Sequence, residues 1–394
     1  MELLILTSRF PYPLEKGDKL RIYNQIKTLS ANHRITLIAL TFSKVSTKQV
    51  EALSPYCEKQ FIFKISLFQQ FINIIRAIFS NKPIQVGLFY SPVIAKRITS
   101  ILNSKKFDSI YCHLIRMADY VIDFNHPNKT IDYMDVFSKG MERRAEKSHG
   151  IKKIIFNMEF KRLLDYENRI FNYFKNHTII SEQDKNLIPH ADKSKIQIIE
   201  NGVDRTIFHS LGGKKKFDLL FTGNMGYPPN IEAAIYAANH ILPLVHKINP
   251  EVTLLIAGIN PSQRIKKLAS DKIFIIDKFE NIRDAFDMCR INLAPMLISI
   301  GLQNKILQAM AMRIPTICST LANNAVNAKD NEEIYVEDSP EGYATKINIL
   351  LTDNQAYNQM VENGYKFVIN RFDWERQNSN LEKLLTPSPE LRTN

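Results

Sequence analysis

Two short segments of this sequence combine residue types that can hold an anion. Lys16-Gly17-Asp18 lies between an apolar run and an amphipathic stretch, and Gly301-Leu302-Gln303-Asn304-Lys305 occupies a similar position further along the chain. A glycine lets the backbone approach a ligand, and the free N–H groups at a helix start favour negative charge. At the second segment the Lys305 ammonium adds a full positive charge. Both segments suit phosphate groups; the alternatives are a helix start capped by Asp18 and a solvated Lys305.

Acidic residues and cysteines give weaker indications of a catalytic or metal-binding site. Asp132 and Asp135 are three positions apart and could form a carboxylate pair for acid–base chemistry or a cation, although we favour structural roles or contacts with an acceptor molecule. The four cysteines are far apart and match no metal-ligand spacing: Cys57, Cys112, Cys289 and Cys318. The sequence therefore predicts no metal site, no disulfide framework and a reducing compartment.

The elements that must position these residues follow an alternating pattern. Short apolar runs predict strands, and an amphipathic stretch from Asp18 to about residue 32 and a longer one over 158–174 predict helices. The predicted strands are Leu3–Thr7, Ile35–Leu40, Ser109–His113, Thr130–Asp135, Thr178–Ser181 and Ile196–Asp204. Continuous apolar strands that alternate with helices are typical of a parallel sheet covered on both faces.

A second series of the same kind follows a break in the pattern. Residues 204–216 contain paired glycines and three consecutive lysines, so they predict a linker. The strands predicted after it are Asp218–Gly223, Val252–Gly258, Lys272–Ile276, Ile291–Pro295 and Thr316–Ser319. The prediction is an α/β protein with two Rossmann-like, doubly wound parallel-sheet domains, 1–203 and 217–370, facing a cleft, and a disordered tail over 387–394.

Composition narrows the class of protein further. With 52 Lys+Arg against 40 Asp+Glu the formal charge is +12, which favours phosphate-bearing partners. The cations are scattered and accompany no nucleic-acid module, so nucleic acid is not a predicted partner. The window Ile62–Phe79 is interrupted by Lys64, Gln69, Gln70, Asn73 and Arg76, and the apolar run before Arg9 is too short for a signal peptide. These features predict no membrane span and a cytoplasmic protein.

The region Phe61–Leu102 combines apolar residues at helical spacing with nearby lysines and arginines. Such a face can belong to the core, or it can lie on an anionic membrane surface and bring the protein to a lipid-linked substrate. Both alternatives are compatible with a peripheral position on the inner face of the cytoplasmic membrane.

Several motifs in order along residues 1–380 resemble one family. The motifs are RFPYPLEKGDKLRIYNQIKTLS, ISE, NGVD, FTGNMGYPPNIEAA and GLQNKILQAMAMRIP. Together they resemble the GT-B glycosyltransferases of family 4, and within it the sugar transferases of bacterial exopolysaccharide clusters. The resemblance implies retaining, metal-independent transfer from a nucleotide-diphosphate sugar to a glycan or polyprenyl-linked acceptor, with no further cofactor, in exopolysaccharide or lipopolysaccharide synthesis. It also implies that the helix over 371–386, which begins near Trp374, crosses back to the first domain.

The resemblance assigns roles to residues at matching positions. Lys305, His113 and Gly17 correspond to residues near the reacting groups, with the acceptor's proton taken by the leaving phosphate rather than by His113. The implied donor-binding residues are Gly17, Gly223, Asn224, Gly301, Leu302, Asn304, Lys305 and Gln308. Ser181 and Asn201 are implied to line the cleft, and Asn201-Gly202 is expected to form a tight turn with a positive φ at Gly202.

Three positions depart from the family pattern. Two acidic positions of the family fall on Ile300 and Gln308, and a basic position falls on Asn224. Gln308 can still hydrogen-bond a ribose hydroxyl, whereas Ile300 has no polar side-chain atom. Two alternatives therefore stay open: a catalytically weak nucleotide-sugar binder that serves a partner protein, and another activity of this fold such as epimerisation. The sequence does not specify the donor sugar, the base, the acceptor or the oligomeric state.

Overall fold

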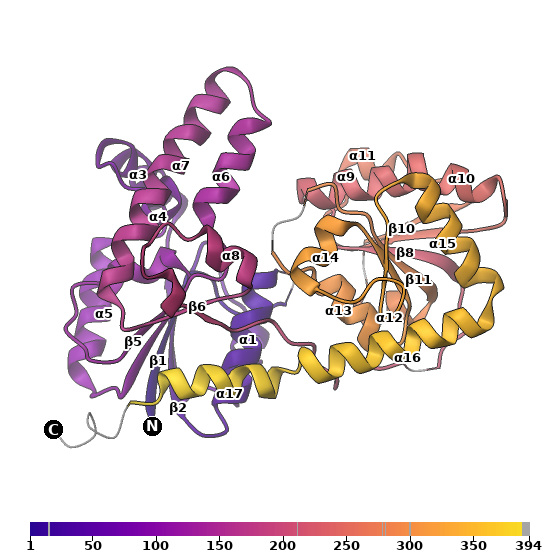
Figure 1. Cartoon of the computed structure of the whole chain (residues 1–394). Helices are drawn as coiled ribbons and strands as arrows, with labels where there is room; N and C mark the ends of the chain where they lie inside the picture. The colour runs from indigo at the N-terminus through magenta and orange to yellow at the C-terminus, as the bar shows by residue number, and fades with distance from the viewer. Residues whose placement is uncertain (15, 211, 278, 280, 299–300, 388–394) are drawn as a thin grey trace. The chain divides into compact units, whose positions relative to one another are not determined.

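The computed structural model describes residues 1–14, 16–210, 212–277, 279, 281–298 and 301–387 (Figure 1). The chain divides into two compact units. The first unit contains Met1–Glu200 and the chain from Glu375 onward, and the second unit contains Asn201–Trp374. The predicted linker over 204–216 lies in the second unit, and its described residues contain no helix or strand.

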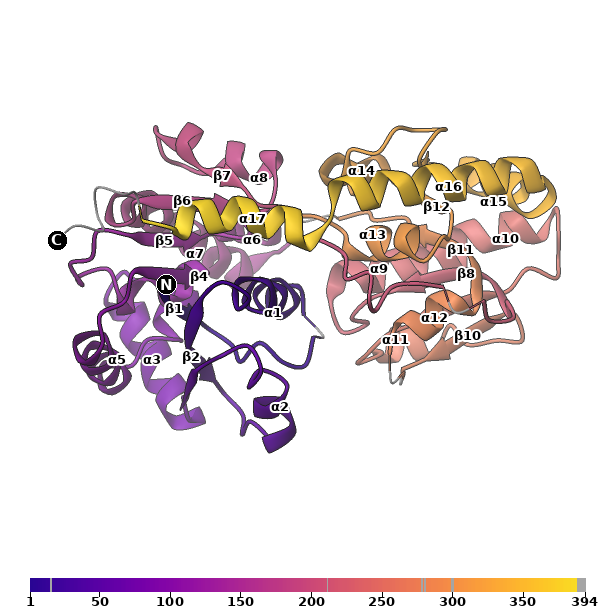
Figure 2. The ribbon, with the colours of Figure 1, turned by 90° about the horizontal axis from the view of Figure 1, so that it is seen from below.

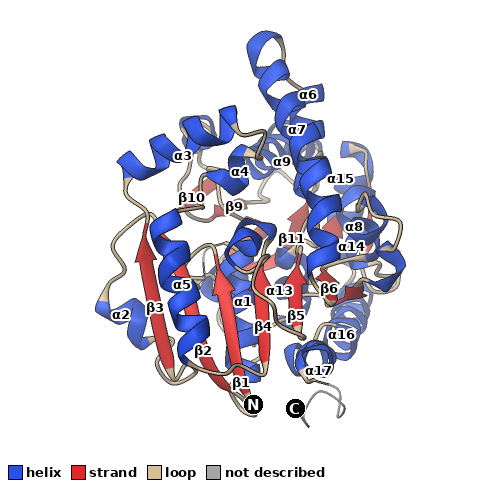
Figure 3. Ribbon diagram, turned by 90° about the vertical axis from the view of Figure 1, so that its left-hand side faces the viewer, coloured by secondary structure: helices blue, strands red, loops and turns tan. Residues whose placement is uncertain are grey.

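The first unit is built on one parallel sheet (Figure 3). Its strands are β1 (Glu2–Thr7), β2 (Arg34–Thr41), β3 (Lys59–Lys64), β4 (Ser109–His113), β5 (Lys129–Asp132), β6 (Asn176–Ile179) and β7 (Gln197–Ile198). In the described residues they pair in the order β3-β2-β1-β4-β5-β6-β7. Its α-helices are α1 (Gly17–Leu29), α2 (Thr47–Glu51), α3 (Leu67–Phe79), α4 (Ile84–Gly87), α5 (Pro92–Ser104), α6 (Phe137–Glu146), α7 (Gly150–Ile170), α8 (Glu182–Leu187) and α17 (Trp374–Leu385). Short 3-10 helices are η1 (Ile115–Tyr120), η2 (Phe171–Tyr173) and η3 (Lys193–Lys195).

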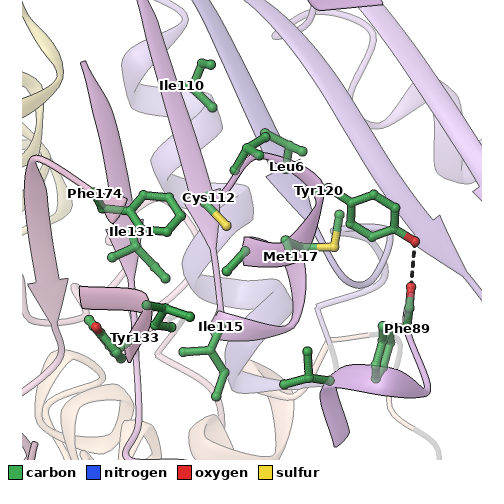
Figure 4. Packing of buried hydrophobic residues seen from close by; sticks show 14 of the residues in the cluster. Leu6, Phe89, Ile110, Cys112, Ile115, Met117, Tyr120, Ile131, Tyr133 and Phe174 are labelled. Carbon is green, nitrogen blue, oxygen red and sulfur yellow. Dashed lines mark hydrogen bonds between the residues drawn. The ribbon is translucent and has the colours of Figure 1, made fainter. Parts of the chain in front are cut away.

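Both faces of this sheet are buried at its centre, which explains why β1 and β2 are almost continuously apolar. Along β1, Leu3 and Ile5 belong to a core with residues of α1 and α17, whereas Leu4 and Leu6 belong to a second core with residues of α5 and α7. Figure 4 shows part of the second core, in which the Tyr120 hydroxyl donates a hydrogen bond to the Phe89 carbonyl at 2.7 Å. The period of two along the strand thus supplies one layer of side chains to each face.

Helix α17 completes the first unit although it comes from the end of the chain (Figure 2). Leu381 and Leu385 are buried in the core with α1. The Asn378 amide donates to the Asn24 carbonyl of α1 at 3.3 Å, and the Asn128 amide donates to the Leu385 carbonyl at 2.7 Å. The first unit therefore needs the last described helix to close one face of its sheet.

The second unit is also an all-parallel α/β sheet. Its strands are β8 (Phe217–Thr222), β9 (Leu254–Ala257), β10 (Ile273–Ile276), β11 (Cys289–Ala294), β12 (Thr316–Cys318) and β13 (Tyr335–Val336). In the described residues they pair in the order β10-β9-β8-β11-β12-β13. Its helices are α9 (Pro228–Tyr236), the π-helical η4 (Ala237–Ile241), α10 (Leu242–His246), α11 (Gln263–Lys266), α12 (Arg283–Asp287), α13 (Asn304–Ala311), α14 (Thr320–Val326), α15 (Pro340–Thr352) and α16 (Asn354–Arg371).

The predicted fold class of two doubly wound parallel-sheet units is confirmed, but several element bounds differ. The strand predicted over Thr130–Asp135 ends at Asp132, and the one predicted over Ile196–Asp204 is reduced to Gln197–Ile198. Strands β3 and β13 were not predicted, because β3 lies at a sheet edge beside an apolar helix and β13 is only two residues long. The tail predicted over 387–394 lies outside the described residues apart from residue 387.

Two local predictions are wrong. The φ angle of Gly202 is not in the left-handed region; instead, a Cβ there would lie 2.6 Å from the Trp374 backbone nitrogen. Glycine is needed at this position for close approach, and Trp374, which is buried, is the residue it approaches. Asp18 does not cap α1, because the N-cap residue is Lys16 and the Asp18 carboxylate instead pairs with Arg9.

Candidate functional site

The strand orders locate one candidate region in each unit. In the first unit the order reverses between β1 and β4, and in the second unit it reverses between β8 and β11. Ligands of doubly wound sheets bind outside the carboxyl ends of the strands at such a switch point. The residues that follow these four strands therefore form two candidate regions, and each is described within its own unit.

In the second unit, the Lys305 side chain is buried beside the β8–β11 switch. Lys305 is only 8% exposed, and its Nζ lies 2.8 Å from Asn230 Oδ1 and 3.6 Å from Met296 Sδ. The Nζ also lies 4.3 Å from the ring centroid of Phe221. Burial lowers the pKa of Lys305 to about 7. Within the described residues no carboxylate lies within ion-pair distance of this ammonium, so a buried cation lacks a counter-charge.

Asn230 holds Lys305 in place from the start of α9. Its side-chain oxygen accepts from Lys305, and its side-chain nitrogen donates to the Asn224 carbonyl at 3.1 Å. A Cβ on Gly223 would lie 2.6 Å from that same amide nitrogen. Gly223, Asn224 and Lys305 are therefore connected through Asn230, a residue to which the sequence analysis assigned no role.

The ends of β8 and β9 present bare backbone beside this group. A Cβ on Gly258 would lie 1.7 Å from the Gly223 carbonyl oxygen, a distance that no side chain can occupy. Gly258 has a φ of +149° and Gly223 a φ of +156°. Two glycines that approach this closely leave backbone groups accessible to a ligand without side-chain cover.

Helix α13 begins one residue before Lys305 and directs its free N–H groups toward its own start. Its N-cap residue, Gln303, makes no side-chain capping hydrogen bond. Asn304 accepts a hydrogen bond from the Asn201 amide at 3.2 Å, which places the predicted cleft residue Asn201 at this helix start. Gln308 lies one turn later on the same face as Asn304 and is half-buried.

The loop before α13 is described only in part. Gly301 has a φ of +70°, and Leu302 is buried. Ile300, one of the positions that departs from the family pattern, lies outside the described residues. A pocket of about 230 Å³ opens beside this loop and is lined by Tyr236, Pro295, Met296, Leu297, Ser319, Leu321, Asp338 and Tyr343. Met296 lines this pocket, and its sulfur also contacts Lys305.

In the first unit, Asp132 at the end of β5 is fully committed to a buried network. Arg21 of α1 donates to both of its oxygens, at 2.7 and 3.2 Å. Tyr111 and Thr178 donate to it at 3.1 and 3.0 Å. Burial opposes ionisation of Asp132, but Arg21 and these donors outweigh it, and the pKa is lowered. Asp132 therefore serves to fix α1 against the sheet.

The charged residues at the carboxyl ends of β1 and β4 are more exposed than the Arg21–Asp132 pair. Arg9 pairs with Asp18 at 2.5 Å. Burial raises the pKa of Asp18, but Arg9, His113 and Arg116 together reverse this and lower it. Arg116 is flanked by the rings of Phe89 and Phe137, with its guanidinium carbon 5.0 and 4.6 Å from their centroids. Gly17, the first residue of α1, belongs to the same edge.

His113 is buried at the end of β4 and is uncharged at neutral pH. Burial lowers its pKa to about 4. Within the described chain neither ring nitrogen has a hydrogen-bond partner, and Nε2 lies 4.0 Å from Asp132. A buried imidazole without partners is available to a ligand but is too weakly basic to hold a proton at neutral pH.

Asp135 and Asp132 have opposite electrostatic environments although they are three residues apart. Burial, together with the charge of Asp184, raises the pKa of Asp135 to about 7. Asp184 is itself bonded to the predicted cleft residue Ser181, whose hydroxyl donates to Oδ2 at 2.6 Å and caps α8. The two aspartates are therefore not an acid–base pair of similar groups.

The structure brings the predicted donor residues of the second unit together and leaves their roles as predictions. Gly223, Asn224 and Lys305 share Asn230, and Asn304 lies at the same helix start. Sequence reasoning missed Asn230, Gly258 and the Arg9–Asp18 pair. The polar Asn230 beside two prolines at a helix start was the signal that could have indicated the first. Among the described residues no three His, Cys, Asp or Glu side chains are grouped as a metal site.

Comparison with known proteins adds three kinds of similarity. Residues 216–353 match the profile of the family described as "Glycosyl transferases group 1". A 44.6 kDa protein from the cps region of Klebsiella pneumoniae is 25% identical over 410 residues, covering 97% of this chain and 99% of that protein.

The structural similarities extend over nearly the whole chain. Anabaena Alr3699/HepE in complex with UDP has a TM-score of 0.69 at 14% identity, over 98% of this chain and 99% of that one. Sucrose-phosphate synthase from Thermosynechococcus elongatus has a TM-score of 0.70 at 12% identity, over 98% of both chains. Staphylococcus aureus TarM also has a TM-score of 0.70 at 12% identity, over 98% of this chain and 99% of that one.

These comparisons support a glycosyltransferase. The chain has the two-sheet GT-B fold, and over residues 216–353 its second unit carries the sequence pattern of the glycosyl transferases group 1.

Proposed function

We propose that this protein is a retaining, metal-independent glycosyltransferase that moves a sugar from a nucleoside-diphosphate sugar to a glycan or lipid-linked acceptor in polysaccharide synthesis. The observation that carries the proposal is the buried Lys305 at the start of α13. A buried cation without a counter-charge is costly unless a ligand supplies that charge. A diphosphate is the ligand chemistry that suits an ammonium, free helix N–H groups and the bare backbone of Gly223 and Gly258.

Sugar transfer requires stabilisation of negative charge, and the positive groups at the start of α13 could provide it. Breaking the bond to the anomeric carbon leaves negative charge on the departing diphosphate, and preorganised positive groups lower the barrier. Lys305 and the α13 N–H groups would supply that charge. The structural relative HepE was solved with UDP, which makes a nucleoside diphosphate the first ligand to test.

The proposed retaining course assigns the acceptor's proton to the leaving phosphate. Two candidate bases in the first unit are poorly suited to take it. His113 has a pKa of about 4, and Asp132 is held as an anion by Arg21. Arg9 and Arg116, at the ends of β1 and β4, would face a phosphate-bearing acceptor such as a polyprenyl diphosphate.

The biological setting is proposed from a single relative. The protein from the K. pneumoniae cps region covers nearly the full length of both chains, which supports work in surface polysaccharide synthesis. In the described residues no helix is long and apolar enough to cross a bilayer. A lipid-linked acceptor would nevertheless require a cytoplasmic protein to act at the inner membrane face.

The first experiment is a thermal-shift panel of UDP, GDP, ADP, dTDP and CMP, each with magnesium and with a chelator. A nucleotide at one hundred times its Kd raises the free energy of unfolding by about 2.7 kcal/mol. We expect one diphosphate to stabilise the protein equally in both conditions and the Lys305→Met variant to lose the shift. Lys267→Met, at an exposed lysine of the same unit, is the matched control.

Turnover then separates an enzyme from a binder. Gln308 and Asn224 occupy positions that are charged in the resembled family, and this favours a catalytically weak nucleotide-sugar binder as the second candidate. With the donor identified, release of the nucleoside diphosphate and the anomeric configuration of the product by NMR test the reaction. Nucleotide binding without release of diphosphate in the presence of membranes and glycans would support the binder and overturn the proposed enzyme.

A further inference from the structure

Helix α3 of the first unit exposes large apolar residues and buries one polar and one small residue. Its exposed large side chains are Leu67, Phe68, Phe71, Ile75, Ile78 and Phe79, and Leu67, Phe68 and Phe79 are 81%, 75% and 87% exposed. At 100° per residue these six positions fall within one stripe of about 120°. The buried residues on the opposite side are Asn73 and Ala77. This is the reverse of a normal surface helix, which turns its apolar stripe to the core.

Specific contacts hold α3 in this inverted orientation. The buried Asn73 donates to the Leu88 carbonyl at 3.1 Å and accepts from Gln69 at 2.8 Å. Ala77 packs so closely on α4 that a Cβ on Gly87 would lie 2.5 Å from the Ala77 Cβ. The polar and small residues are thus the ones that fit the protein, and rotation of the helix to bury its phenylalanines would break both contacts.

The start of α7 carries a second exposed apolar group. Ile151, Ile154 and Ile155 are exposed in its first two turns, beside Lys152 and Lys153. The two helices are tied together, because Arg162 of α7 donates to the Ala77 and Ile78 carbonyls of α3 at 3.1 and 2.9 Å. Figure 3 shows α3 and the α6–α7 hairpin at the end of the first unit's sheet toward which its strands point.

The segment that contains α3 carries charged residues of one sign only. Residues 59–107 contain no Asp or Glu and eight cations: Lys59, Lys64, Arg76, Lys82, Lys96, Arg97, Lys105 and Lys106. Lys64 and Arg76 are exposed on or beside α3, and within the described chain neither has a carboxylate at ion-pair distance. The same holds for Lys152 and Lys153 of α7. An exposed apolar stripe with these four exposed cations beside it complements a surface that is apolar inside and anionic outside.

We propose that the exposed apolar stripe of α3, together with the start of α7, is a docking surface for an anionic phospholipid bilayer. The phenylalanines enter the boundary between headgroups and acyl chains, and the surrounding lysines and arginines bind the anionic headgroups. The same end of the sheet carries Arg9, Asp18 and His113, so docking brings the bilayer to the edge proposed for a lipid-linked acceptor. This inference goes beyond the proposed function, because bilayer binding needs neither nucleotide nor sugar transfer.

The test is co-sedimentation of the full chain with phosphatidylcholine vesicles that contain either no phosphatidylglycerol or about 30% of it, near 0.1 M and 0.5 M salt. We expect binding to the anionic vesicles that weakens at the higher salt. The Phe68→Asn/Phe71→Asn variant should lose at least about tenfold in partition coefficient. Tyr173→Asn/Ile248→Asn, at two exposed apolar residues elsewhere, is the matched control and should bind as the unsubstituted protein does.

The charge contribution has its own matched pair of variants. One variant changes four exposed cations of the proposed surface to Gln: Lys64, Arg76, Lys152 and Lys153. The other changes four exposed lysines of the second unit to Gln: Lys214, Lys247, Lys267 and Lys366. The net charge falls equally in both variants. Only the variant changed at Lys64, Arg76, Lys152 and Lys153 should lose binding to anionic vesicles. Circular dichroism and thermal melting confirm that all variants fold.

Three outcomes would overturn the proposal. One is that the unsubstituted protein does not bind anionic vesicles, and another is that the Phe68→Asn/Phe71→Asn variant binds them as strongly. The third is that these substitutions convert a dimer to a monomer without changing vesicle binding, which would assign the surface to a second copy of the chain. A failure of nucleotide binding would overturn the proposed function and leave the vesicle result standing.

Discussion

Arg21 in the first unit and Lys305 in the second are both buried cations near a switch point, and their surroundings are opposite. Arg21 is fully buried and donates to both oxygens of Asp132, which two further side chains also bind. Lys305 contacts an amide, a thioether and an aromatic ring, and no carboxylate among the described residues. Removing one partner of a buried ion pair is costly, because the other charge is left unpaired. A buried charge that has no counter-charge already carries a stability cost, which an anionic ligand can remove.

The largest expected effect comes from breaking the satisfied pair. Arg21→Leu leaves Asp132 buried and unpaired, so we expect a loss of about 3–5 kcal/mol in the free energy of unfolding. Urea denaturation followed by circular dichroism measures it. Lys305→Met should instead leave the ligand-free protein as stable as before or more stable. Equal destabilisation by the two substitutions would remove the distinction between these regions.

The second effect concerns turnover. Removal of one preorganised charge stabiliser typically costs a factor of about 10²–10³ in kcat, and we expect this for Lys305→Met with the identified donor. Release of the nucleoside diphosphate measures it, with Lys267→Met as the control. An unchanged kcat would exclude Lys305 from the mechanism.

The third effect is the contribution of Lys305 to the pH dependence of stability. Its pKa is about 7 in the folded protein and near 10.5 in the unfolded chain, so above pH 7 the unfolded state binds more protons. The stability of the ligand-free protein should therefore rise between pH 7 and 9, by up to about 1.4 kcal/mol per unit. Denaturation at several pH values should show this rise in the unsubstituted protein relative to Lys305→Met. Nucleotide affinity should fall over the same range, because the diphosphate binds the charged form.

The smallest effects test the residues that surround Lys305. Asn230→Ala removes the acceptor that orients the ammonium, and we expect a fall of about tenfold in nucleotide affinity with a smaller change in stability. Gln308→Glu should preserve or improve donor affinity if this side chain binds the ribose hydroxyls. Isothermal titration measures both, and a folded Gln308→Glu variant that does not bind donor would contradict that role.

Elements of the first unit differ in how far the sequence predicted them. Strand Ser109–His113 was predicted with its observed bounds, because three apolar residues lie between the polar Ser109 and His113. Strand β3 was missed, because its short apolar run at the sheet edge precedes a still more apolar helix. The periodicity of α3 was visible in the sequence, but which of its sides is buried was not. That depends on Gly87 and Leu88, which fit only the side that carries Ala77 and Asn73.

By itself the sequence determined the α/β class, the two tandem sheets and the glycine-containing loops, since these follow from local apolar patterning and backbone freedom. The tertiary structure alone decided which charges are satisfied. Asp132 and Arg21 are 111 positions apart, and Lys305 and Asn230 are 75 apart. Such pairings arise when parallel strands bring their carboxyl ends to one edge, and the spacing of residues along the chain does not record them.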